Sequence, residues 1–177
     1  MYFLDSPSTR PRFPCTPDPP TTWDAMILSV LSDLDNDSFR YRLNRMIMRG
    51  KQSGIYFANE THYRIFYRGS KQLRQDRPYL LSVVYLLSSC KKLWSKVCSD
   101  KLPSEIIFDD RSIGKVTAND YTIYSFAKDL HTGSRHISVT DMADILLIPD
   151  KQFALICNAI TIHSFGTVAL DFMPDKA

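Results

Sequence analysis

The sequence predicts a single compact multi-helix domain of the all-α class, or a mainly α domain with a minor two-stranded element. The chain has 177 residues, of which 44% are hydrophobic, and this suits one domain with its own core. Apolar residues recur at helical spacing in several segments that short polar stretches separate. No apolar heptad persists over three or four repeats, so the pattern favours a globular helical domain over a coiled coil.

The first 20 residues differ from the rest of the chain. They contain six prolines, and each proline removes a backbone donor and disfavours helix at the residue before it. We therefore expect residues 1–20 to form a flexible proline-rich arm, residues 21–166 to form the helical domain, and residues 167–177 to form a C-terminal tail of uncertain order.

The first half of the domain predicts four helices. Apolar residues from Trp23 to Leu34 fall on one helical face, and Thr21 or Thr22 is suited to cap that helix. Tyr79–Ser88 is apolar nearly all round, as a central buried helix would be. Two amphipathic helices are predicted between them: Ser38–Arg49, with Asp37 as cap and Gly50 as stop, and a helix that begins at Asn59.

The second half predicts four shorter or capped helices and one extended segment. The extended candidate is Glu105–Phe108, which with Ile55–Phe57 would supply the minor strands. Glycines and short polar side chains mark the helix boundaries. The predicted helices are Lys91–Cys98, a helix from the cap Thr117 to His131 with Gly133 near its end, one from Ser138 or Thr140 through Ile145, and one from the cap Asp150 to Gly166.

Charge is unevenly distributed along the chain. The net charge is only +3, yet residues 38–101 carry +11 and the remaining residues carry −8. Two such parts can attract each other within the fold, or the basic part can bind nucleic acid or an acidic protein surface.

Two sets of basic residues are spaced to form stripes on predicted helices. Arginine binds phosphates and carboxylates alike, and a tyrosine beside the second stripe, Tyr63 or Tyr67, could stack on nucleic-acid bases. The first stripe has members at i, i+3 and i+7, and the second at i, i+4 and i+7. The candidate residues for binding nucleic acid or a partner are Arg42, Arg45, Arg49, Arg64, Tyr67, Arg68, Lys71 and Arg74.

No motif indicates catalysis, and we expect neither a cofactor nor a bound metal. Phosphate-binding glycine loops, the H-E-x-x-H pattern and the G-x-S-x-G elbow are all absent. The four cysteines form no C-x-x-C pair and are expected to be free thiols. One metal-dependent alternative stays open, in which Asp109 and Asp110 join a third carboxylate, from Asp120, Asp129 or Asp144, in a nuclease site.

The N-terminus lacks the apolar run of a secretory signal, and the longest apolar stretch, Leu80–Leu87, is far shorter than a membrane-spanning helix requires. We therefore expect a cytoplasmic protein without a membrane partner.

Residues 55–163 resemble a family of small phage and Gram-positive bacterial proteins that is known only as a domain of unknown function. The resemblance starts with an F-x-x-E-x-H-x-x-x-F spacing at Phe57, Glu60, His62 and Phe66. It continues through the segments Leu80–Leu87, Ile106–Asp109, Asp120–Thr122, Phe126–Leu130, Ser138–Asp141 and Phe153–Ile162. Asp120–Thr122 lacks the tryptophan that the family tends to carry there, and no catalytic residue is transferred. The resemblance implies an accessory protein that acts on host machinery or host defence.

The leading hypothesis is a phage or mobile-element accessory protein that binds and inhibits a host protein or ribonucleoprotein, for example a CRISPR effector, through its basic helical faces. The alternative is a module that binds RNA or DNA without a protein partner. The nuclease is third. The sequence specifies neither the partner, nor the oligomeric state, nor the role of the arm, and it leaves enzymatic activity open.

Overall fold

The computed structural model confirms the all-α class. It describes residues 20–50, 54–73, 77, 79–98, 106–110 and 113–174, and these contain helices and turns but no strand. The helices are α1 (Trp23–Leu31), α2 (Asp37–Gly50), α3 (Glu60–Gln72), α4 (Tyr79–Ser88), α5 (Lys91–Val97), α6 (Ala118–Thr132), α7 (Val139–Ala143), α8 (Asp150–Phe165) and the 3-10 helix η2 (Gly166–Phe172).

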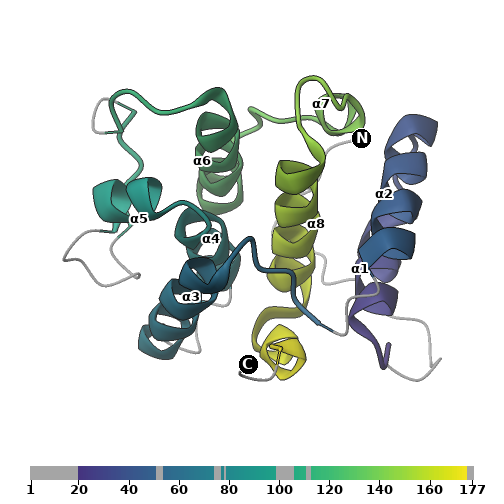
Figure 1. The fold of residues 1–177 in the computed structure, drawn as a ribbon, viewed down its shortest axis with the longest axis horizontal. Helices are drawn as coiled ribbons and strands as arrows, with labels where there is room; N and C mark the ends of the chain where they lie inside the picture. The colour runs from purple at the N-terminus through teal and green to yellow at the C-terminus, as the bar shows by residue number, and fades with distance from the viewer. Residues whose placement is uncertain are drawn as a thin grey trace.

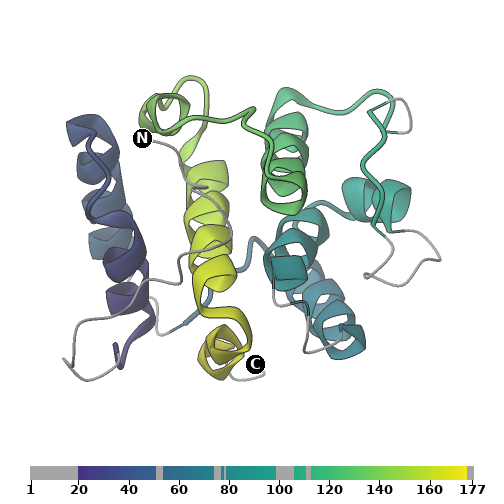
Figure 2. The same ribbon diagram turned by 180° about the vertical axis from the view of Figure 1, so that it is seen from behind.

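Helix α8 lies at the centre of the molecule. Figure 1 shows α1 and α2 on one side of it and α3, α4, α5 and α6 on the other, and Figure 2 shows the same order from behind. Helix α4 packs against α3, α5, α6, α8 and η2, and α8 packs against α1, α4, α6 and η2. These two helices therefore form the core on which the other elements are placed.

The predicted central helix is confirmed. All residues from Leu80 to Ser88 are buried, so α4 is covered on every side, as its uniformly apolar sequence requires. Gly69 on α3 permits a close approach here, because a Cβ at this position would lie 2.9 Å from Cγ1 of Val84. The basic helix α3 is thus held tightly on the core through its small residue.

Most predicted capping residues are also confirmed. The side chains of Thr22, Asn59, Thr117 and Ser138 each accept a hydrogen bond from a backbone N–H in the first turn of the following helix. Gly133 adopts the left-handed conformation (φ 74°) that ends α6.

Four boundaries differ from the predictions. Helix α1 ends at Leu31 rather than Leu34, and α7 ends at Ala143 rather than Ile145. Asn36, not Asp37, accepts the hydrogen bond from the Phe39 amide at the start of α2. Pro149 is the N-cap of α8, so Asp150 lies within its first turn.

The minor strands and the C-terminal tail also differ from expectation. Residues 55–57 and 106–108 are irregular, because neither segment has a strand partner among the described residues. Residues 166–172 form η2, in which the Phe172 carbonyl accepts a hydrogen bond of 2.9 Å from the Ile55 amide. The Phe172 ring also packs on Trp23, so η2 is part of the packed domain.

The segment Asp150–Phe172, formed by α8 and η2, is the only one in the described part of the chain that is long and apolar enough to cross a membrane. Within the fold, 67% of that window is buried, which is typical of the core helix of a globular domain.

Candidate interaction surfaces

Of the eight predicted binding residues, the structure describes seven, and it divides these between two surfaces and the interior. Arg42, from the first stripe, is 5% exposed. Its guanidinium donates hydrogen bonds to the carbonyl oxygens of Met142 (2.6 Å) and Ile148 (2.8 Å), and it lies 4.3 Å from the centre of the Phe153 ring. Arg42 therefore joins α2 to α7 and to the loop before α8. This buried position differs from the expected position on an exposed stripe.

On α2, Arg45 is half-buried and Arg49 is exposed. Arg45 contacts both carboxylate oxygens of Asp150, at 3.0 and 2.8 Å, while Arg42 contacts Asp150 Oδ1 at 3.1 Å. Partial burial opposes ionisation of Asp150, but the two arginines outweigh this and lower its pKa. The carboxylate also lies in the first turn of α8, where the helix dipole favours negative charge.

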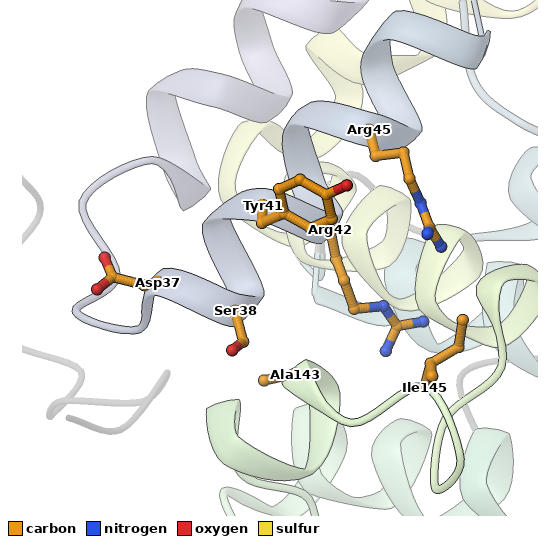
Figure 3. Close-up of a pocket in the computed structure, with 7 residues that line it drawn as sticks. All are labelled: Asp37, Ser38, Tyr41, Arg42, Arg45, Ala143 and Ile145. Atoms are coloured by element: carbon orange, nitrogen blue, oxygen red, sulfur yellow. The ribbon is translucent and has the colours of Figure 1, made fainter.

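Two open hollows flank these arginines. The larger, of about 370 Å³, lies between α2 and the segment after α7 and is shown in Figure 3. In this view the Arg42 side chain reaches from α2 toward Ala143 and Ile145, with the Tyr41 ring beside it. The second hollow, of about 230 Å³, is lined by Arg42, Arg45, Arg49 and Asp150 among others. The two hollows share Arg42 and Arg45, so they adjoin one another.

Large apolar side chains are exposed on α2 and in the loop after α7, and two of them, Tyr41 and Ile145, line the first hollow. Leu146 is 89% exposed, Met48 80% and Tyr41 69%. Tyr41, Arg45 and Met48 follow one another at i, i+4 and i+7 on α2, and therefore share one helical face. We define the α2 surface as Tyr41, Arg45, Met48, Arg49, Ile145, Leu146 and Leu147.

The second stripe lies on α3. The rings of Tyr63 and Tyr67 are nearly parallel, with an interplanar angle of 7° and centroids 6.0 Å apart. Lys71 Nζ lies over the Tyr67 ring, 4.0 Å from its centre, and Arg64 pairs with Glu60 one turn away. We define the α3 surface as Tyr63, Arg64, Tyr67, Arg68 and Lys71; Arg64, Arg68 and Lys71 are exposed and the tyrosines are half-buried.

The two surfaces are separate. Helices α2 and α3 lie on opposite sides of α8 in both views (Figures 1 and 2). The last candidate of the second stripe, Arg74, lies outside the described residues. Helical spacing identifies the members of each stripe, and the structure places the two stripes on two separate surfaces.

The carboxylates considered for a nuclease are dispersed. Asp110 pairs with Lys128 at 2.9 Å, and the hydrogen bond from the Lys128 ammonium lowers the pKa of Asp110. Asp129 is buried and accepts hydrogen bonds from the backbone amides of His136 and Ile137, so it stabilises the loop after α6. Within the described residues, no group of three His, Cys, Asp or Glu side chains could hold a metal ion.

The histidines do not converge on one site. His136 Nδ1 lies 2.6 Å from Asp129, whereas His131 packs between the rings of Phe108 and Tyr79. His163 contacts the Ser82 hydroxyl at 3.3 Å, and burial lowers the pKa of both His131 and His163.

His62 is built into the core. Its Nδ1 accepts a hydrogen bond from the Ala58 amide (3.1 Å), and its Nε2 lies 2.9 Å from the Tyr85 carbonyl oxygen, to which it donates in that tautomer. Burial lowers the pKa of His62 to about 4, so the imidazole is neutral at physiological pH.

Three of the four cysteines are described, and all three are free thiols. Cys98 and Cys157 are buried, and burial raises the pKa of Cys98 to about 12 and that of Cys157 further. Neither is suited to act as a nucleophile, because the thiolate is the reactive form. Cys90 is half-buried, and Cys15 lies outside the described residues.

Sequence reasoning missed the apolar members of the α2 surface. A usable signal was present for Tyr41 and Met48, because both fall away from the predicted inward face of their helix, which contains Phe39 and Leu43. The sequence predicts a helix end at Ile145, the first of three consecutive apolar residues, whereas the structure places residues 145–147 in an exposed loop.

No family model matches the chain, and no curated protein and no solved structure matches it either. The resemblance to the phage family therefore stays a prediction from the residues that carry it.

Proposed function

We propose that this protein is a non-catalytic accessory factor that binds a host ribonucleoprotein and blocks it. In this proposal the α3 surface binds single-stranded RNA of the target. The single observation that carries the proposal is the combination of three exposed cations with two parallel tyrosine rings on one face of α3. A cytoplasmic location is part of the same proposal.

The chemistry of the α3 surface suits single-stranded nucleic acid. Proteins that bind such strands combine cations that follow the backbone with aromatic rings that stack on bases, and each stacked base contributes about 1–3 kcal/mol. Lys71 covers the Tyr67 ring through a long, flexible side chain. Its ammonium group can move to a phosphate and leave the ring to a base, while Arg68 supplies a second phosphate contact.

The proposed target class comes from the resemblance to phage accessory proteins. Such proteins act on host machinery, and a nucleic-acid-guided defence complex such as a CRISPR effector carries both RNA and protein surface. The charge asymmetry supports this choice, because the +11 segment contains α3 and all of α2 except its first residue, Asp37.

The test is capture of the target from host lysate with and without ribonuclease, followed by an activity assay of the captured complex. We expect a ribonucleoprotein whose capture falls after ribonuclease treatment and whose activity is inhibited by the purified protein. Recovery of RNA without an associated host protein would instead support the module that binds nucleic acid without a protein partner.

Matched variants assign the contact to α3. Arg68→Glu and Tyr67→Leu should weaken capture, whereas Tyr67→Phe, which keeps the ring, should preserve it. Lys115→Glu, an exposed charge reversal in the loop before α6, controls for net charge. Equal effects of Arg68→Glu and Lys115→Glu would contradict a specific role of the α3 surface.

A further inference from the structure

We propose that the α2 surface is a docking site for an acidic amphipathic segment of a partner protein, an α-helix that presents both apolar and carboxylate side chains. This site is distinct from the α3 surface, and the inference does not depend on RNA binding.

Exposed apolar side chains are concentrated on the α2 surface. Eight large hydrophobic residues are exposed in the described part of the chain, and five of them belong to the α2 surface. An isolated exposed leucine needs no explanation, but a cluster rimmed by polar groups is typical of a protein-binding site. The most exposed member, Leu146, has the most apolar area to bury on a partner.

The loop that carries Ile145, Leu146 and Leu147 is ordered by hydrogen bonds. The Asp144 side chain accepts a hydrogen bond of 2.8 Å from the Leu146 amide, and the Asp144 carbonyl accepts one of 3.0 Å from the Ile148 amide. Arg42 binds the carbonyl oxygens on both sides of the loop. The loop that carries the apolar side chains is therefore ordered before a partner binds, so binding costs less conformational entropy.

The charge of the α2 surface favours an acidic partner. Asp150 is shared between Arg42 and Arg45, and Arg49 makes no ion pair with any residue the structure describes. Asp37, the carboxylate beside the larger hollow, is already paired with an arginine one turn away. Asp144, which is exposed in the same loop, is the other carboxylate here, so Arg42, Arg45 and Arg49 exceed Asp144 and Asp150 by one positive charge. Carboxylates on a partner complement this excess.

The same charge disfavours a second copy of this chain. A symmetric dimer through the α2 surface would bring Arg45 and Arg49 of one copy toward the same residues of the other. Like charges at an interface are unfavourable, so an acidic partner fits better than self-association.

Helix-in-groove binding fits the shape. The two adjoining hollows run beside α2 and share Arg42 and Arg45, so a carboxylate entering between them meets the guanidinium of Arg45. Apolar side chains one turn away on the same bound helix can then reach Tyr41 and Leu146, as such helices use anchors at i, i+3, i+4 and i+7.

The experiment is selection of binders to the purified full chain from a displayed library of randomised helical peptides. We expect enrichment of peptides that combine apolar residues at helical spacing with several Asp or Glu. Binding of a synthesised winner should weaken about tenfold or more in Leu146→Ser and in Arg49→Glu. Both positions are exposed, so the variants should stay folded, which circular dichroism checks.

Two controls and three contrary outcomes complete the test. Val168→Ser, which changes an exposed apolar residue on η2, and Lys115→Glu should leave peptide binding unchanged. Enrichment of basic or uncharged peptides, no enrichment, or equal affinity in the α2 variants would overturn the proposal. So would displacement of the peptide by single-stranded RNA, or a dimer in sedimentation that Leu146→Ser dissociates. The double variant Arg64→Glu, Arg68→Glu should keep peptide binding, so failure here and failure of the RNA proposal are distinguishable.

Discussion

The indole Nε1 of Trp23 donates a hydrogen bond of 2.8 Å to Oδ1 of Asn158, and so joins the first helix of the domain to its central helix. The same oxygen accepts a hydrogen bond of 3.0 Å from the backbone amide of Tyr56. One buried amide therefore satisfies donors from α1 and from the segment between α2 and α3, and it fixes both against α8.

Asn158→Ala should lower the free energy of unfolding by about 2–4 kcal/mol, because two buried donors lose their acceptor. Thr161→Val is the matched control on the same helix, since its hydroxyl bonds only to the Cys157 carbonyl four residues earlier. We expect that substitution to cost less than about 1 kcal/mol. Urea denaturation measures both, and equal costs would contradict the role given to Asn158.

Arg42 and Arg49 should differ in their effect on stability although both belong to the predicted stripe. Arg42→Gln removes the charged donor to two carbonyl oxygens and should cost about 2–4 kcal/mol. Arg49→Gln lies on the surface and should change stability by less than about 0.5 kcal/mol. Comparison of the two unfolding free energies is the measurement, and a neutral Arg42→Gln would mean that the α2 to α8 junction is held by other contacts.

His62 should make stability depend on pH. Its pKa is lowered to about 4 in the folded state by burial, so between about pH 6.5 and pH 4 the unfolded chain binds a proton that the folded chain does not. As the pH is lowered through this range, the free energy of unfolding should therefore fall, by about 3 kcal/mol in total from this residue. Above about pH 6.5, His62 should not make the free energy of unfolding depend on pH.

Urea denaturation of wild type and His62→Gln at about pH 7.5 and about pH 4.5 measures this contribution. The variant should lose less stability on acidification, while a smaller dependence persists because the pKa values of His131 and His163 are also lowered. An identical acid loss in both proteins would exclude His62 as its source.

The helices were predictable where the signal is local. Thr117 caps the start of α6 with its side chain, and Gly133 ends the helix in a left-handed conformation. Both effects depend only on neighbouring residues. The end of α7 was not predictable, because Ile145 continues an apolar pattern. The side chain of Asp144 accepts a hydrogen bond from the Leu146 amide, and this favours a turn over a further turn of helix.

The candidate sites depended on tertiary contacts that spacing does not reveal. Arg42 and Arg45 belong to one stripe by periodicity, yet the carbonyl oxygens that bind Arg42 come from residues about 100 positions later in the chain. The separation of the α2 and α3 surfaces depends on α8, which lies between their helices (Figure 1). Helical periodicity assigns a face on a helix but not what that face meets.

The central claim, that the α3 surface binds single-stranded RNA through phosphate contacts, is tested most directly by the salt dependence of affinity. For single strands, log K falls against log salt concentration with a slope of about −0.7 for each phosphate contact. We predict that Arg68→Gln, Lys71→Gln makes the slope about 1.4 shallower, because each cation contacts one phosphate, while Lys91→Gln, Lys115→Gln leaves it as in wild type. A slope near zero for the wild type, or the same slope in both double variants, would contradict it.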